Sequence, residues 1–327
     1  MNNHDSVFPR SSYLFSNTCM DAKLSVSLQT IENNINMKKQ ILTSCLLLLV
    51  LFTSAQTVEE VMAKFEEANG GKNKLKAIKT LQMESVMKMN MMGQTFDINL
   101  NSIRERGKLY RRQMGGIMGM GNSWTMVTDT AGYILIPAMP NFGGGGGFGG
   151  GPGGGQGGQR GGANNQGAAG SGSTITKMTD DDLRKQQHEL DCAGAFSMLV
   201  DYVKKGYTAE LLGTSKVNKE ECYKIKLTMK DGLSGTFYIN KNNFLVQQVD
   251  AADEMAAAMT GFGSIMRMMG GGRRSLKVSI QYSDYKEIAG IKFPMKQLIS
   301  LGSVETLIEH LDIKLNEPVD EVWYKVK

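Results

Sequence analysis

Histidine and cysteine, two residue types that often carry chemistry, are scarce in this sequence. Beyond residue 55 the chain has two histidines, His188 and His310, and two cysteines, Cys192 and Cys222. None of them lies in a nucleophile turn or at the spacing of a metal-binding motif. The glycine-rich stretch lacks the Lys-Ser/Thr pair of a phosphate loop. The sequence therefore predicts a protein that is not an enzyme and that uses no metal or cofactor.

Methionine is the abundant residue with unusual chemistry, with 23 in the chain. In "LQMESVMKMNMMG" the residues Leu81, Met83, Met87, Met89 and Met91 alternate with mostly polar ones, which is the pattern of a half-buried strand. Thioethers bind Cu(I), but copper-binding methionines tend to lie in exposed loops near a His or Cys. Methionine also adapts to variable apolar partners. The alternatives we favour are a pliable cavity lining and a packed core.

A second methionine cluster lies in "AADEMAAAMTGFGSIMRMMGGG". Its apolar residues recur at steps of three and four, as on one stripe of a helix. We interpret the stripe as a mobile lid over an apolar opening or as an element that touches a membrane. A helix packed permanently on the sheet is the alternative. The stripe consists of Met255, Met259, Phe262, Met266 and Met269.

The elements that must position these residues are mostly strands. A capped amphipathic helix is expected from Thr57 to Gly70-Gly71. The methionine strand and a partner carrying Phe96, Ile98 and Leu100 form a hairpin around residues 92–94. Further strand patterns follow, with helices expected from Asp180 and within 195–206. The inventory predicts an α+β fold with a curved, mainly antiparallel sheet.

The N-terminal part has the features of an exported chain. Residues 37–55 read as a signal peptide, with Lys38 and Lys39, an apolar run, and small residues before cleavage after Ala55. The run is shorter than the roughly 20 residues of a membrane-spanning helix. We expect residues 1–36 to be a disordered leader or to precede the true start at Met37. "LTSC" resembles a lipobox, but Cys45 comes before the apolar run, which argues against lipidation.

The mature region, 56–327, is predicted to be one domain. Residues 142–173 are glycine-rich and cannot bury enough apolar surface to fold, so we expect a disordered insertion. Cys192 and Cys222 could pair in an oxidising compartment, or they could be two buried free thiols. The net charge of +5 comes without a basic and aromatic cluster, which argues against nucleic acid as a partner.

Several strand motifs resemble the LolA/LolB-like family of outer-membrane lipoprotein carriers. "ERGKLYRRQM" at Glu105–Met114 resembles the family's Lys-Arg-Pro-Asn-apolar-aromatic strand, and "VTDTAGYILIP" resembles the Val-Ser-Asp-Gly segment that follows it. In this match Arg106 takes the place of the family's functional arginine and Gly107 replaces the usual proline. Arg104 and Arg112 are the alternative candidates for that arginine.

The resemblance implies a half-open β-barrel, closed by the N-terminal helix and internal helices, whose apolar face shelters acyl chains in the periplasm. It also implies lipoprotein or lipid acyl chains as partners, with inner- and outer-membrane transfer components as further candidates. A carrier of another hydrophobic molecule and a solidly packed structural module of the cell envelope are the rival interpretations. The residues assigned to the cavity are Met83, Met87, Met89, Met91, Phe96, Ile98, Leu100, Arg106 and Tyr110.

Overall fold

The computed structural model describes residues 35, 37–40, 56–91, 93–116, 121–138, 172–260 and 276–326. The chain divides into two compact units, Met1–Gln56 and Thr57–Lys327. In the first unit, residue 35 and residues 37–40 are helical and exposed. Cys45, the apolar run of the expected signal peptide and its cleavage site at Ala55 lie outside the described residues. Among the helices that are described, none is long and apolar enough to cross a membrane.

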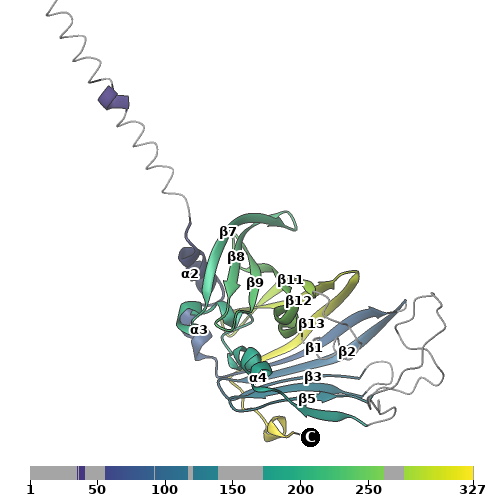
Figure 1. Cartoon of the computed structure of the whole chain (residues 1–327). Helices are drawn as coiled ribbons and strands as arrows, with labels where there is room; N and C mark the ends of the chain where they lie inside the picture. Colours follow the sequence, from purple (N-terminus) through teal and green to yellow (C-terminus); the bar gives the residue numbers. More distant parts are fainter. Residues whose placement is uncertain are drawn as a thin grey trace, which may run out of the picture. The chain divides into compact units, whose positions relative to one another are not determined.

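One antiparallel sheet of 13 strands forms the framework of the second unit (Figure 1). The strands are β1 (Thr80–Met91), β2 (Gln94–Glu105), β3 (Leu109–Met114), β4 (Ser123–Thr128), β5 (Gly132–Ile136), β6 (Thr174–Lys177), β7 (Thr208–Val217), β8 (Glu220–Thr228), β9 (Ser234–Asn240), β10 (Val246–Ala252), β11 (Lys277–Ile288), β12 (Ile291–Leu301) and β13 (Val304–Leu315).

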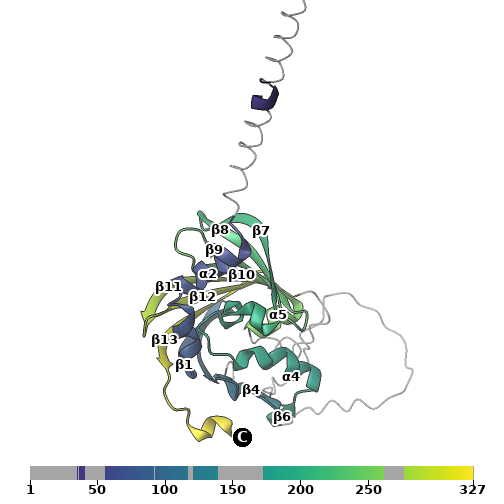
Figure 2. The same cartoon turned by 90° about the vertical axis from the view of Figure 1, so that its left-hand side faces the viewer.

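The strand order consists of two meanders that meet in the middle of the sheet. It runs β6-β5-β4-β3-β2-β1-β13-β12-β11-β10-β9-β8-β7, so the first and last strands are neighbours. The edges, β6 and β7, do not pair, and the sheet stays open while it curves strongly around the helices (Figure 2). The predicted α+β fold with a half-open, mainly antiparallel barrel is confirmed. The expected glycine-rich insertion joins β5 to β6, which are paired neighbours.

Short helices lie against the inner face of the sheet, which is the face that carries most of the buried apolar side chains. They are α2 (Val58–Ala68), α3 (Lys72–Ala77), α4 (Asp180–Gln186), α5 (Asp253–Thr260) and the 3-10 helices η1 (Gln187–Leu190), η2 (Ser197–Leu199) and η3 (Tyr202–Lys205). A further 3-10 helix, η4 (Glu321–Tyr324), belongs to the C-terminal tail. The predicted Thr57 cap is present, because its side chain accepts from the Glu60 amide in a capping box.

The main core cluster fills the space between the inner face and the helices. Val61, Met62 and Phe65 of α2 are buried in it, as their helical spacing predicts. The inner segment, residues 187–207, contributes Phe196, whose ring packs edge-on against Tyr282 of β11 at 4.8 Å between centroids. One continuous cluster thus ties both meanders to the helices.

The inner segment differs from the helix predicted over residues 195–206. It forms η2 and η3 in place of one α-helix. Asp201, between them, adopts a left-handed backbone conformation with φ 51°, which breaks the regular helical path. The turn brings the Asp201 carboxylate to Lys72 and Lys76 of α3, so contacts from another helix stabilise the break.

The C-terminal tail, residues 317–326, covers part of the outer face of the sheet. Val319 and Trp323 pack on a separate small cluster of Leu109, Trp124 and Met126. Arg111 fixes the tail, because its Nη1 donates to the carbonyls of Trp323 and Lys325 at 3.1 and 2.6 Å. The sequence analysis did not anticipate this docking.

Candidate functional site

The methionine strand faces the interior. Met83 and Met87 of β1 are buried, and Met87 is 0% exposed. Ile98 of β2 and Ile308 of β13 lie opposite Met87 on its two sides, so all three side chains are on the inner face. The period-2 pattern in the sequence therefore identified the correct buried face.

Apart from Met91 and Arg106, the residues assigned to the cavity fall into three groups. Met83, Met87, Ile98 and Leu100 belong to the main core cluster. Met89 and Phe96, opposite one another near the hairpin turn, are half-buried and pack against its rim. Tyr110 lies in a different cluster, with Val127 of β4 and Leu190 of η1. The side chain of Met91 is outside the described residues.

The predicted lid begins as a helix that is already packed. Met255 of α5 is buried in the main core cluster, and Met259 is half-buried against it. The helix lies on β10 and β11. Phe262, Met266 and Met269 lie outside the described residues, so the lid assignment stays a prediction for them.

Cys192 and Cys222, the two cysteines among the described residues, are both free and buried. Cys192 belongs to the main core cluster, whereas Cys222 packs with Val217 and Tyr238 in another. Burial raises the pKa of the Cys192 thiol to about 11, which keeps it protonated and unreactive. Of the two alternatives from the sequence, this structure has the free thiols.

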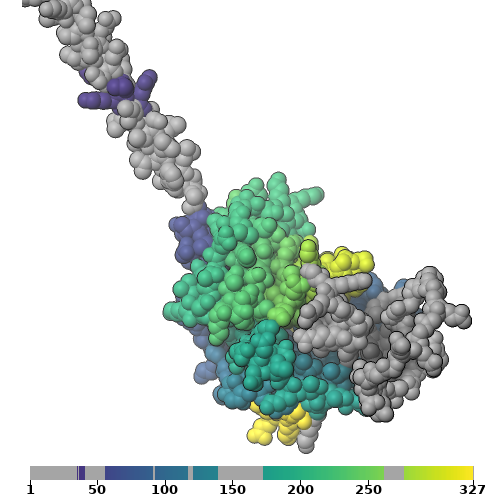
Figure 3. Space-filling model, viewed as in Figure 1, coloured from purple at the N-terminus to yellow at the C-terminus, as the bar shows by residue number. Residues whose placement is uncertain are grey.

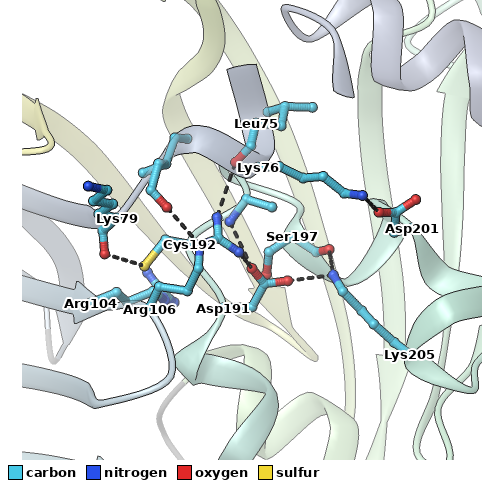
Figure 4. Close-up of polar contacts among 12 residues, drawn as sticks. Leu75, Lys76, Lys79, Arg104, Arg106, Asp191, Cys192, Ser197, Asp201 and Lys205 are labelled. Carbon is cyan, nitrogen blue, oxygen red and sulfur yellow. Dashed lines mark hydrogen bonds and ion pairs between the residues drawn. The ribbon is translucent and has the colours of Figure 1, made fainter. Parts of the chain in front are cut away.

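Arg106 joins three parts of the fold that are distant in sequence (Figure 4). Its Nε donates to the carbonyl of Ile78 at 2.7 Å, and its Nη2 donates to that of Leu75 at 3.2 Å. Both carbonyls belong to the C-terminal end of α3, where helices lack internal donors. Its Nη1 donates to Asp191 of the inner segment at 2.7 Å. Arg106 thus fixes α3 and the inner segment to the end of β2.

A second arginine fixes the beginning of the inner segment. The Arg104 guanidinium pairs with the Glu189 carboxylate and stacks on the Tyr110 ring, 4.8 Å from its centroid. Burial would raise the pKa of Glu189, but the charge of Arg104 outweighs it, and the pKa is lowered. Because the pair is charged and largely shielded from water, with side chains 21% and 11% exposed, removing either partner leaves an uncompensated charge.

Lysines complete a network of ion pairs around the inner segment. Lys205 pairs with Asp191 and donates to the Ser197 carbonyl at 2.5 Å. Lys72 and Lys76 both pair with Asp201, and they outweigh its burial, lowering its pKa to about 2. The network fixes the irregular backbone of the inner segment, and Figure 4 shows its contacts with Arg106 and with the residues of α3. In the space-filling view α4 lies between the two meanders (Figure 3).

Sequence reasoning missed the acidic partners Glu189, Asp191 and Asp201. Arg106 and Asp191 are 85 positions apart, and no local pattern links them. The feature of the sequence that pointed to these ion pairs was the arginine-rich stretch at residues 104–112. Within the described residues, no group of three or more His, Cys, Asp or Glu side chains could hold a metal ion.

Comparison with known proteins gives matches in fold alone. No family model and no curated protein matches the sequence. Among solved structures, the chain is similar to a LolA superfamily protein from Nitrosomonas europaea, with 11% identity, 83% of this chain and 99% of that chain covered, and a TM-score of 0.47. A DUF1329 family protein from Desulfovibrio piger matches with 11% identity, coverages of 83% and 98%, and a TM-score of 0.41.

A third match is assigned as an outer membrane lipoprotein-sorting domain from Vibrio parahaemolyticus, with 8% identity, coverages of 80% and 94%, and a TM-score of 0.37. LolA-superfamily and lipoprotein-sorting proteins are thus among the folds that this chain is similar to.

Proposed function

We propose that the mature chain is a non-enzymatic periplasmic carrier or binding protein that shelters lipoprotein acyl chains or lipids. The observation that supports this most is the inner face of an open sheet lined by methionine. Each CH₂ group moved from water to an apolar surface contributes about 0.8 kcal/mol, so an acyl chain needs a long apolar host. Flexible methionine side chains suit a host for chains of different shape.

The ends of the methionine row suggest where cargo enters. Met87 and Ile98 are buried, whereas Met89 and Phe96, one step nearer the hairpin turn, are half-buried. Small movements of these side chains would let an acyl chain lie against the apolar surface that they form. Transfer components of the inner or outer membrane are the partners we propose for loading and release.

A packed structural module of the cell envelope is the second candidate. The complete burial of Met87 within one continuous cluster favours it. A carrier of another hydrophobic molecule is a variant of the first proposal. The two main candidates differ in one observable, which is whether the protein takes up an amphiphile.

Native mass spectrometry of the protein purified from its own periplasm, without detergent, tests the choice. We expect an acylated peptide or lipid to be released on activation, and an intact mass that corresponds to cleavage after Ala55. A chain that carries no cargo and also takes up no added lipid would favour the packed module. A copper adduct would instead point to thioether ligation.

A further inference from the structure

A group of polar side chains crosses the otherwise apolar inner face. Ser85 of β1 lies between the buried Met83 and Met87, and His310 of β13 is directly opposite it. The Ser85 Oγ is 2.7 Å from His310 Nδ1, and the Gln297 Nε2 of β12 is 2.8 Å from His310 Nε2. These three residues therefore form one hydrogen-bonded row across three adjacent strands.

A β-bulge places His310 in this row. The register between β1 and β13 shifts between Glu84 and Ser85, and Leu311 is the extra residue on β13. As a result Leu311 is 67% exposed, while His310 turns to the inner face beside the buried Ile313 and Ile308. Exposing a leucine while a histidine is half-buried opposes the usual folding preference, and such reversals are expected at functional sites.

Within the described residues, the hydrogen bonds of the row leave one donor without an acceptor, and that donor is the Ser85 hydroxyl. A side-chain amide nitrogen can only donate, so His310 Nε2 accepts from Gln297 and the ring proton is on Nδ1. Burial, together with the charges of Arg112 and Arg104, lowers the pKa of His310 to about 4, which keeps the ring neutral. The Nδ1 proton then points to Ser85 Oγ. The hydroxyl proton of Ser85 is left for another acceptor.

Arg112 adds positive charge to the same face. It lies on β3 between Ser102 of β2 and Thr125 of β4, which are its direct cross-strand partners. The strand spacing places the Cα of Arg112 about 12 Å from the Cα of Ser85. The Arg112 side chain and a small polar head group of a ligand can together span this distance. The charge of Arg112 also acts on the His310 ring.

Among the described residues, the charges on this part of the inner face do not balance. Two guanidiniums, Arg104 and Arg112, act on one carboxylate, Glu189, which already accepts a hydrogen bond from Arg104. The internal segments 117–120, 139–171 and 261–275 have no Asp or Glu in their sequence and thus add no anion. Arg112 is half-buried, and its hydrogen bond with Tyr110 is to a neutral group. A charge removed from water is costly without a countercharge, so an incoming anion would be stabilised here.

We propose that Arg112, Ser85, His310 and Gln297 form a polar row that binds the oxyanion head group of an amphiphile, a carboxylate or a phosphate. The proposal rests on the carrier function, and it specifies the class of cargo. The Arg112 guanidinium donates two hydrogen bonds to the oxyanion, and Ser85 donates its hydroxyl proton, oriented by His310. The hydrocarbon chain then lies along Met87 and Met89. The strand from Ser85 to Met89 is about 13 Å long.

Equilibrium binding of three amphiphiles that share an oleoyl chain tests the polar row. Oleate carries a carboxylate, oleoyl lysophosphatidate carries a phosphate, and monooleoylglycerol is neutral. We expect the wild type to bind at least one of the two anions about tenfold more tightly than the neutral amphiphile. Arg112→Gln should reduce that preference to about twofold, and Ser85→Ala should reduce it by a smaller factor.

Lys88→Gln is the matched control, because it removes one cation from the outer face of β1, where Lys88 pairs with Glu309. It should leave both the affinities and the preference unchanged, and circular dichroism of all variants checks the fold. Preference for oleate alone identifies a carboxylate site, and preference for lysophosphatidate alone identifies a phosphate site. Either result supports the proposal.

Three other results would overturn it. Equal binding of charged and neutral amphiphiles by the wild type would contradict the polar row while leaving the carrier function intact. An equal loss of all three ligands in Arg112→Gln would mean that the residue acts through packing. Failure of all three amphiphiles to bind the wild type would remove the carrier function, and the polar row with it.

Discussion

Replacement of Arg106 by leucine should destabilise the protein by detaching α3 and the inner segment from β2. The substitution removes three hydrogen bonds from a charged donor, two to α3 carbonyls and one to Asp191. Buried bonds of this kind contribute roughly 1.5–3 kcal/mol each, but the Arg106 side chain is 35% exposed. Solvent therefore replaces part of each bond. We expect a loss of about 2 kcal/mol in the free energy of unfolding.

Urea titration and calorimetry measure that loss. For a domain of this size, about 2 kcal/mol corresponds to a fall in Tm of roughly 4–8 °C. Asp191 keeps Lys205 as a partner in the variant, so the chain should still fold. In the carrier interpretation, cargo release should also change, because the inner segment is held less firmly. Transfer of a bound lipoprotein to an acceptor is the assay for that effect.

Lys108→Leu provides the matched control, because Lys108 lies two residues away in the same turn and its 68%-exposed side chain pairs only with Glu105 among the described residues. It should change the free energy of unfolding by less than about 0.5 kcal/mol. If Arg106→Leu behaved like this control, the three bonds would not hold the segments together. A coupling energy near zero between Arg106→Leu and Asp191→Asn would refute the same reasoning for that pair.

Three further predictions concern other parts of the fold. The pKa of His310 falls from 6.5 to about 4 on folding, so between these pH values the unfolded chain binds a proton that the folded chain does not. The free energy of unfolding should therefore be highest above about pH 6.5 and decrease by roughly 3 kcal/mol as the pH falls to 4. Urea titrations of His310→Gln should show a shallower decrease. Arg111→Met should release the C-terminal tail, because Arg111 binds two of its carbonyls, and hydrogen exchange should become faster in residues 317–326 but not in the central strands. Met87→Ala should lower the free energy of unfolding by about 2–5 kcal/mol if Met87 is packed, and Met89→Ala should lower it by less than half as much, as measured by calorimetry. A loss under about 1 kcal/mol in both variants would indicate that the methionine row faces a cavity.

The fold could be predicted from the sequence to the extent that its patterns are local. Alternation in β1 and β2 identified both strands and their buried faces. The expected turn at residues 92–94 contains Gly93, whose φ of 77° suits a tight hairpin. The Thr57 cap and the acidic first turn of α4 correctly located the N-termini of two helices. Each of these features depends on residues within a few positions of one another.

The candidate site depends on contacts that no local pattern contains. The arginine-rich stretch from the end of β2 to β3 was recognised, but the acidic partners of Arg104 and Arg106 lie far along the chain. Asp191 was not distinguishable from a solvent-exposed acidic residue. The bulge at Leu311 reverses the alternation within β13, so a strict period of two assigns the wrong face to one end of that strand. Long-range pairing and register shifts explain most of what the sequence could not predict.

The meeting of β1 and β13 at the centre of the sheet has a consequence for the order of folding. Ser85 and His310 are 225 positions apart, whereas most other strand pairs are hairpin neighbours. Closing so long a loop carries a large entropic cost before any contact offsets it. Each meander can form while the chain is still emerging, but the central pair must wait for the final strand. The two halves of the sheet should therefore be joined last, and a chain that ends before residue 304 would have no central pair.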